Sequence, residues 1–402
     1  MNAEQHVPQF RFKGFSDSWE QHKLSDGTNK IGDGLHGTPK YSEDGDVYFV
    51  NGNNLVNGQI VITSETKRVT SNEQSKDDKA LNENTILMSI NGTIGNLAWY
   101  RGENLMLGKS AAYIEVSDFD KKFIYTYLQT RPVKDYYLNS LTGTTIKNLG
   151  LKAIRNTNIY TPTIDEQAKI GVLFQNLDMT ITLHQRKLAK LKELKKGYLQ
   201  KLFPQNSEKV PEFRFKGYSD AWEKRKLREI TEINPKGKIP EVFRYVDLES
   251  VKNSSIISSK IETKQTAPSR AQRTAEIGDV FYQTVRPYQK NNVIFLLHSS
   301  MPYVFSTGYA QLRSNMNSFF ILYLVQTDGF VNDVLNRATG TSYPAINPTH
   351  LATIIVCFPK IVSEQNRIGQ VLEHLDNLIT ATQCKLDLLK KLKKGYLQKM
   401  FC

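Results

Sequence analysis

Two internal repeats constrain the fold of this 402-residue chain more than any other feature of its sequence. The octapeptide LKKGYLQK occupies residues 194–201 and returns, letter for letter, at residues 392–399. Upstream of each copy, residues 166–188 align without a gap on residues 364–386. A second block, residues 7–24, returns at residues 210–227 with 13 of 18 positions identical. Because the period is about 200 residues, the chain consists of two half-molecules in tandem.

The segment upstream of each octapeptide has the apolar spacing of a long helix. Spacings of four and three alternate through residues 163–203 and 360–402, which predicts the seam of a coiled coil. Asp165 and Ser363 are matched N-cap candidates, and Thr163 with Glu166 is an alternative capping box. We expect the two helices to pair antiparallel, with a length that fixes the separation of two domains. The seam positions are Ile170, Phe174, Leu177, Ile181, His184, Leu188 and Leu191, matched by Ile368, Leu372, Leu375, Ile379, Thr382, Leu386 and Leu389.

The segments between these repeats predict two mixed α/β domains. Short apolar runs at 47–50, 60–63, 85–90 and 111–116 alternate with turn residues and precede a helical stretch at 123–138. The second half shows the same order, with strands at 245–248, 280–283 and 293–297 and a helix at 317–336. The residues themselves mostly differ, TGTT at 142–145 against TGTS at 339–342 being the main exception.

The expected fold class is therefore α+β, a tandem repeat with pseudo-two-fold symmetry in which two mixed α/β domains are joined by an antiparallel coiled coil. The expected boundaries are a leading segment and first domain at 1–162, a helix at 163–203, a linker at 204–209, a repeated leading segment and second domain at 210–359, and a helix at 360–402. A repeated framework with divergent domains indicates one partner bound twice and two different targets. The alternative is an old duplication that drifted wherever helices need not pack.

The charge of the chain indicates a polyanionic partner. A formal net charge of +13 and a pI near 9.3 favour nucleic acid, or less often an acidic membrane surface. The two helix ends carry 13 Lys and Arg against two acidic residues, so nearly all the excess lies there. Such lysines form a phosphate-facing surface, or else a solvated face that complements the helix dipole.

No motif in the sequence predicts catalysis. Residues 102–110, GENLMLGKS, resemble a phosphate-binding loop, but five residues rather than four separate its glycines. Cys357, Cys384 and Cys402 form no CxxC pair, which fits a reducing compartment and no metal site. No apolar run reaches the roughly 18 residues of a membrane span, and no secretory signal is visible, so we expect a soluble cytoplasmic protein.

The loops of both domains carry side chains suited to base edges and phosphates. For any single asparagine in an Asn-Gly pair, a turn is the more frequent explanation. The candidate DNA-binding residues of the first domain are His36, Lys40, Asn51, Asn53, Asn54, Asn91, Thr93, Lys109, Thr144 and Lys147. Those of the second domain are Lys236, Lys238, Arg270, Arg273, Arg286, Tyr288, Gln289, Lys290 and Tyr343. The candidate partner-docking residues are Tyr198, Leu199, Tyr396 and Leu397 of the octapeptides.

These features together resemble the DNA-specificity subunit of type I restriction-modification systems. The resemblance rests on GDGLHGTPKY at 32–41, the two helices that open with Glu-Gln at Glu166 and Glu364, the octapeptides and the leading blocks. It implies two target recognition domains that read a bipartite asymmetric site in double-stranded DNA, two docked methyltransferase subunits and further restriction subunits. S-adenosylmethionine, ATP and Mg would then be cofactors of the partners, with no cofactor, metal or catalysis in this chain. The rival hypotheses are an enzyme with an unrecognised active site and a basic coiled-coil adaptor for RNA, a membrane or another polyanion.

Overall fold

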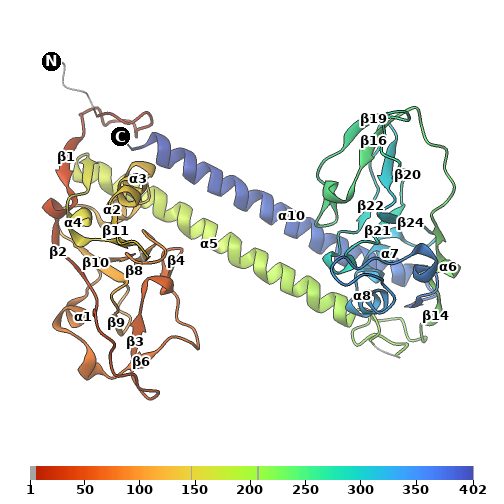
Figure 1. Ribbon diagram of the computed structural model, residues 1–402, viewed down its shortest axis with the longest axis horizontal. Helices are drawn as coiled ribbons and strands as arrows, with labels where there is room; N and C mark the ends of the chain where they lie inside the picture. Colours follow the sequence, from red (N-terminus) through yellow and green to blue (C-terminus); the bar gives the residue numbers. More distant parts are fainter. Residues whose placement is uncertain (1–5, 146, 206–207, 402) are drawn as a thin grey trace. The chain divides into compact units, whose positions relative to one another are not determined.

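The computed structural model describes residues 6–145, 147–205 and 208–401, so two residues of the expected linker, 206 and 207, and Cys402 lie outside the described residues. The chain divides into unit 1, residues 1–185 with 385–402, and unit 2, residues 186–384. The boundary falls within both long helices, α5 (Ile164–Lys201) and α10 (Val362–Lys399). Each unit therefore contains the first part of one long helix and the last part of the other (Figure 1).

Unit 1 is built on a four-stranded antiparallel sheet in the order β2-β10-β7-β8 and a three-stranded sheet in the order β6-β3-β9. Five of the six residues of β10 are buried, as its apolar run predicts for a central strand. In the smaller sheet, β3 pairs parallel with β9 and antiparallel with β6. The strands are β1 (Glu20–Lys23), β2 (Thr28–Asp33), β3 (Val47–Val50), β4 (Leu55–Val56), β5 (Gln59–Ile60), β6 (Arg68–Val69), β7 (Thr85–Ser89), β8 (Leu97–Trp99), β9 (Leu105–Leu107), β10 (Ala111–Val116), β11 (Leu141–Thr142), β12 (Asn148–Leu149) and β13 (Asn158–Thr161), and the short helices are α1 (Lys76–Ala80), α2 (Lys121–Tyr127), α3 (Arg131–Asn139) and α4 (Leu151–Arg155).

Unit 2 repeats this plan with different residues. Its sheets have the orders β15-β24-β21-β22 and β19-β16-β23-β20, and β16 pairs parallel with β23 as β3 does with β9. The strands are β14 (Glu223–Lys226), β15 (Glu232–Ile233), β16 (Val242–Val246), β17 (Val251–Lys252), β18 (Ser255–Ile256), β19 (Lys260–Thr263), β20 (Ala271–Thr274), β21 (Val280–Gln283), β22 (Val293–Ile294), β23 (Tyr303–Ser306), β24 (Tyr309–Arg313) and β25 (Ile355–Phe358), and the short helices are α6 (Leu227–Ile230), α7 (Ser318–Leu324), α8 (Asp328–Leu335) and α9 (Pro348–Leu351).

Several local predictions need correction, and the strands expected at 245–248 and 293–297 are β16 at Val242–Val246 and β22 at Val293–Ile294. The single helix expected at 123–138 is two helices, α2 and α3, because Thr130 and Pro132 begin a new helix. The helix expected at 317–336 is likewise split into α7 and α8, and the Thr327 hydroxyl caps α8 by accepting the Phe330 N–H. The strand expected at 60–63 ends at Ile60, because the Asn54 N–H donates to the Asn51 carbonyl and the Asn54 side chain, in place of a backbone N–H, donates to the Val61 carbonyl.

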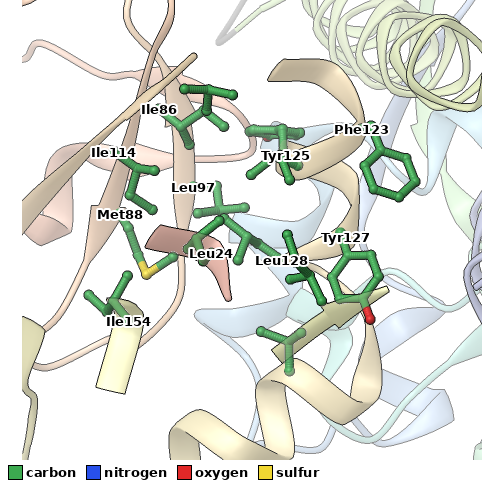
Figure 2. Close-up of a cluster of buried hydrophobic side chains, with 14 of the residues drawn as sticks. Leu24, Ile86, Met88, Leu97, Ile114, Phe123, Tyr125, Tyr127, Leu128 and Ile154 are labelled. Atoms are coloured by element: carbon green, nitrogen blue, oxygen red, sulfur yellow. The ribbon is translucent and has the colours of Figure 1, made fainter. Parts of the chain in front are cut away.

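The core of unit 1 lies between the four-stranded sheet and α2, as Figure 2 shows. Apolar side chains of the sheet meet the aromatic face of α2 there, and Leu24 and Ile154 fill the space beside them. The side chains in contact include Ile86, Met88, Leu97, Ile114, Phe123, Tyr127 and Leu128.

A glycine in the first part of each long helix allows close packing on the domain. A Cβ at Gly171 of α5 would lie 2.7 Å from the Asp120 carboxylate, just before α2. A Cβ at Gly369 of α10 would lie 2.7 Å from the Asn317 side chain, just before α7. The repeated Ile-Gly pair is therefore explained by the approach of each long helix to the start of a shorter one.

The fold class predicted from the repeats is confirmed, with antiparallel packing of long-helix segments inside each unit. In unit 1, Phe174 of α5 contacts Phe401, which follows α10, and Asp178 contacts Lys393 on α10. Of the N-cap candidates, Asp165 and Ser363 were wrong, because α5 begins at Ile164 and α10 at Val362, which places both residues within the first turn; the alternative candidate Thr163 directly precedes α5.

Candidate nucleic-acid interface

Three loops of unit 1 that carry candidate residues meet beside the ends of its central strands. The Ser110 hydroxyl donates to Asn51 Oδ1 at 2.8 Å and accepts the Gly52 N–H at 2.9 Å. The Asn91 side chain donates to the Lys109 carbonyl at 3.3 Å. These bonds bring the loops at 51–54, 91–96 and 108–110 together, as a composite recognition surface requires.

The side-chain amides of two candidate asparagines, Asn51 and Asn54, form hydrogen bonds within the protein. Asn54 Oδ1 accepts the Asn51 N–H at 2.9 Å, and Asn54 Nδ2 donates to the Val61 carbonyl at 3.0 Å. Asn51 is the partner of Ser110. The turn explanation therefore accounts for these contacts, whereas Asn53 between them is exposed.

The remaining candidates of unit 1 lie at the surface. His36 contacts Asp33 at 2.8 Å, and Leu35 beside it bridges to Gly108, which places the 34–41 loop next to Lys109. Thr144 lies in the hairpin of β11 and β12, which is joined to the other loops by a bridge between Asn91 and Asn148. The exposed candidates are His36, Lys40, Asn53, Thr93, Lys109, Thr144 and Lys147.

In unit 2 the 284–292 loop holds two candidates in a strained and well-braced form. Arg286 and Lys290 have φ of 54° and 52°, in the left-handed region that such residues rarely adopt. The Arg286 guanidinium lies over the Tyr343 ring, 4.2 Å from its centroid. Tyr288 is half exposed on the turn between them. The loop therefore presents a fixed guanidinium and exposed aromatic rings to a ligand.

Buried amides brace the same loop from below. The Gln283 N–H donates to Asn292 Oδ1 at 2.8 Å, and Gln283 Nε2 donates to Gln289 Oε1 at 3.0 Å. Lys290 forms an ion pair with Asp328 at 2.5 Å, and this hydrogen bond lowers the pKa of the Asp328 carboxyl. Lys290 is thus committed to an intramolecular ion pair, whereas Tyr288 and Gln289 are exposed and Arg286 is half-buried.

The other four candidates of unit 2 gather around β20. The Thr307 N–H donates to the Arg270 carbonyl, and the Thr284 N–H donates to the neighbouring Gly308 carbonyl, which links Arg270 to the 284–292 loop. Thr274 of β20 donates to the Lys238 carbonyl at 3.4 Å. Lys236, Lys238 and Arg270 are exposed. Arg273 is half-buried, and burial lowers the pKa of its guanidinium.

A cavity of about 510 Å³ in unit 2 joins the basic helix end to these loops. Among its lining residues are five lysines, of which Lys195 and Lys290 are neutralised by Asp376 and Asp328. The cavity is rich in cationic and amide groups, which suits an anionic ligand. Its lysines are Lys192, Lys195, Lys196, Lys252 and Lys290.

Some lysines of the helix ends form contacts within each unit instead of a free basic surface. Lys195 pairs with Asp376 at 2.7 Å in unit 2, and the equivalent Lys393 pairs with Asp178 at 2.6 Å in unit 1. Their side chains are only 17% and 16% exposed. The identical letters at these positions are therefore explained by identical ion pairs between α5 and α10.

The sequence interpretation missed the contact between each leading block and its long helix. Arg11 holds Glu166 with two bonds of 2.8 Å, and Arg214 holds Glu364 with bonds of 2.8 and 3.0 Å. Both carboxylates are almost fully buried. The available signal was that an arginine and a glutamate recur at matched positions of both repeats.

The residues after each octapeptide fill a pocket of aromatic side chains. Phe203 packs on Trp222 and Phe320 in unit 2, and Phe401 packs on Trp19 and Phe123 in unit 1. The candidate docking residues Tyr198, Leu199, Tyr396 and Leu397 are half-buried against the same two cores. By contrast, the first residue of each octapeptide, Leu194 or Leu392, is exposed by 48% or 41%. This repeated exposed leucine was not among the candidates.

In the described part of the chain, no helix is long and apolar enough to cross a membrane, and no three His, Cys, Asp or Glu side chains are grouped so as to hold a metal ion.

Comparisons with known proteins agree with the repeat. A family model of the type I restriction modification DNA specificity domain matches residues 17–193 and again residues 219–391. The type I restriction enzyme MjaVIII specificity subunit of Methanocaldococcus jannaschii is 23% identical over 333 residues, which cover 78% of this chain and 77% of that subunit. The crystal structure of a type I restriction-modification S subunit from M. genitalium shares the fold with a TM-score of 0.66 at 16% identity, covering 98% of this chain and 99% of that chain.

Proposed function

Because the chain belongs to the family of type I restriction-modification DNA specificity subunits, we propose that it reads a bipartite, asymmetric site in double-stranded DNA with two target recognition domains. Residues 1–162 and 210–359, each with its leading segment, would be the recognition domains. Residues 163–203 and 360–402 would be the spacing helices, with the linker at 204–209. Since its proposed partner is chromosomal DNA, we further propose that the subunit works in the cytoplasm.

One observation supports this proposal above all: the framework contacts are identical in the two units, whereas the loops are not. The Arg–Glu and Lys–Asp pairs recur at matched positions. The loop after β7 in unit 1 is Asn-rich, NGTIGN, but the equivalent loop after β21 in unit 2 carries Arg286, Tyr288 and Lys290. The side chains of the two loops differ in their hydrogen-bonding groups, amides in unit 1 and aromatic and cationic groups in unit 2, so the two loops fit different sequences.

The repeated framework would bind the same partner twice. We propose that two methyltransferase subunits dock on the octapeptides, through the exposed parts of Tyr198, Leu199, Tyr396 and Leu397 together with Leu194 and Leu392, and that restriction subunits join through them. Methyl transfer from S-adenosylmethionine and cleavage driven by ATP with Mg would be carried out by those partners. The present chain would supply recognition, spacing and assembly, and no catalytic group.

The test is a methylation map of the assembled complex. The full chain is co-expressed with its methyltransferase subunit in a host that lacks adenine methylation, and methylated adenines are located by single-molecule sequencing. A two-part motif with a fixed gap is expected. Replacing residues 24–162 by those of another family member should change one half of the motif only. A complex that methylates DNA with no two-part motif, or a chain that binds RNA and random duplexes equally, would contradict the proposal.

A further inference from the structure

The hairpin that follows α3 in unit 1, residues 141–149, has the same form as the one that follows α8 in unit 2, residues 339–346, although the domains around them have diverged. In unit 1, Thr142 pairs with Asn148, and its hydroxyl donates to the Asn148 carbonyl at 3.3 Å. In unit 2, Thr339 bridges to Ala345, and its hydroxyl donates to the Ala345 carbonyl at 3.5 Å. Both hairpins therefore have the same register and the same number of residues in the turn.

Each hairpin is also fixed to its domain in the same way. The Leu149 N–H donates to the Ile90 carbonyl at 2.9 Å in unit 1, and the Ile346 N–H donates to the Thr284 carbonyl at 3.0 Å in unit 2. Ile90 directly follows β7 and Thr284 directly follows β21, and each stands just before the loop that carries the candidate base-reading residues. The hairpins thus stand beside the two loops that differ most in chemistry.

The turns themselves expose polar groups. Each begins Thr-Gly-Thr, with the glycine at φ of 90°, a conformation that only glycine adopts readily. The two residues after the glycine carry exposed hydroxyls, on Thr144 and Thr145 in unit 1 and on Thr341 and Ser342 in unit 2. Hydroxyl groups and turn N–H groups of this kind are common donors to phosphate oxygens.

A cation accompanies each turn. Lys147 is exposed within the first hairpin. Beside the second, the Arg286 guanidinium lies 4.2 Å from the ring centroid of Tyr343 in the turn. The backbone N–H of Arg286 donates to the Pro344 carbonyl at 2.7 Å. A guanidinium stacked on a ring keeps its N–H edge available and loses less freedom on binding a phosphate.

We propose that these two hairpins are phosphate clamps, which hold the sugar–phosphate backbone of DNA in both half-sites and do not read bases. The inference rests on the proposed function and deepens it. Two domains that read different sequences have in common only the backbone of their targets, so an element preserved in both should contact that backbone. Thr144, Lys147, Arg286 and Tyr343 are thereby assigned to positioning, and base reading falls to the other residues of the 91–96 and 284–292 loops.

The test removes one charge from each clamp in the full chain, co-expressed with its methyltransferase subunit. Lys147→Gln and Arg286→Gln should each weaken binding to the duplex about tenfold at moderate salt. Each should also reduce the slope of log affinity against log salt by about 0.9. The loss should be the same for the cognate duplex and for duplexes with one base pair changed, and the methylated motif should keep every letter. Arg286→Lys should retain the slope.

Arg131→Gln is the matched control, because this exposed arginine lies on α3, outside the loop cluster. An equal loss of slope in the control, or no loss in either clamp variant, would overturn the assignment while leaving the proposed function intact. A relaxed or altered letter in one half-site would show that the variant residue reads a base, which also overturns it. A wild-type complex without any two-part motif would overturn the proposed function and the clamps together.

Discussion

Arg11 and Glu166 lie 155 residues apart in sequence and share two parallel hydrogen bonds of 2.8 Å, Nε to Oε1 and Nη2 to Oε2. Arg214 and Glu364 repeat the geometry in unit 2, where the Trp222 indole adds a third bond to the carboxylate at 3.3 Å. The pair fastens each leading block to the first turn of a long helix. Its bidentate form and its burial make it a structural joint of each unit.

Removing one partner of this joint should be costly. Arg11→Ala leaves the Glu166 carboxylate, which has 0% of its side chain exposed, without its counter-ion. We expect the free energy of unfolding to fall by about 3–5 kcal/mol, measured by urea denaturation. Arg11→Met combined with Glu166→Leu should recover most of the loss, because no charge then remains buried. A loss below about 0.5 kcal/mol in the single variant would contradict this account.

The aromatic residue after each octapeptide should stabilise the unit into which it packs. Phe401→Ala and Phe203→Ala each empty a pocket of aromatic rings, and a loss of about 3–5 kcal/mol in the free energy of unfolding is expected for each. Val172→Ala on α5 is the control, because this side chain is 43% exposed, and its effect should stay within about 0.5 kcal/mol. Tryptophan fluorescence measures the loss of stability, since Trp19 and Trp222 line the two pockets.

The octapeptides should affect assembly before they affect recognition. Leu194→Lys and Leu392→Lys alter exposed side chains, so they should leave the unfolding midpoint unchanged and weaken capture of the methyltransferase subunit by about tenfold or more. Tyr198→Ala and Tyr396→Ala should weaken assembly too, with a loss of stability because these rings are half-buried. Gel filtration of the co-expressed subunits measures assembly. Altered motif letters with intact assembly would place base reading on the helices.

Alkaline pH should unfold the protein through its buried tyrosines. Burial raises the pKa of Tyr137, Tyr282 and Tyr323 above the ordinary value of 10.0. Above pH 10 the unfolded chain has lost a proton that each folded tyrosine still holds, so the free energy of unfolding falls as pH rises. Each such group contributes a slope of about 1.4 kcal/mol per pH unit. Tyr137→Phe should flatten the loss between pH 10 and 11, and an unchanged profile would contradict the assignment.

The proposed spacing helices can be lengthened between the two ion pairs that each of them makes. On α5, Leu191 lies between Asp178, bonded in unit 1, and Lys195, bonded in unit 2. On α10, the equivalent Leu389 lies between Asp376 and Lys393. A heptad inserted after each adds about 10 Å of helix, so the gap in the DNA motif should grow by about three base pairs. Methylation mapping should show unchanged half-sites, and a constant gap would refute the spacing role.

Much of the fold followed from repetition and periodicity. The heptad spacing gave both long helices, and the apolar runs gave β10 and β21 to the residue. The breaks between α2 and α3 and between α7 and α8 were missed, because the apolar pattern continues across them while Thr130 and Thr327 restart the helix. The expected N-caps Asp165 and Ser363 lie inside the first turn of their helices, because residue type alone does not separate a cap from a polar residue just after it.

Less of the candidate interface could be predicted. Residue type identified loops that the structure brings together, such as those of Asn51, Asn91 and Lys109. It could not separate Asn53, which is exposed, from Asn54, whose amide closes the turn, because both have the same chemistry. Nor could it show that Lys195 and Lys393 are neutralised, because their partners, Asp376 and Asp178, lie 181 and 215 residues away in sequence.

The position of Phe401 in unit 1 has a consequence for how the protein is made. The core around Trp19 and Phe123 needs a side chain that the ribosome adds nearly three hundred residues after Phe123. The first domain therefore waits, incompletely packed, while the second is synthesised, whereas the second finds Phe203 already present. A nascent chain released before residue 401 would be damaged in its earliest domain and not in its latest. A chain that ends just before residue 401 should therefore be cleaved by proteases in its first domain sooner than in its second.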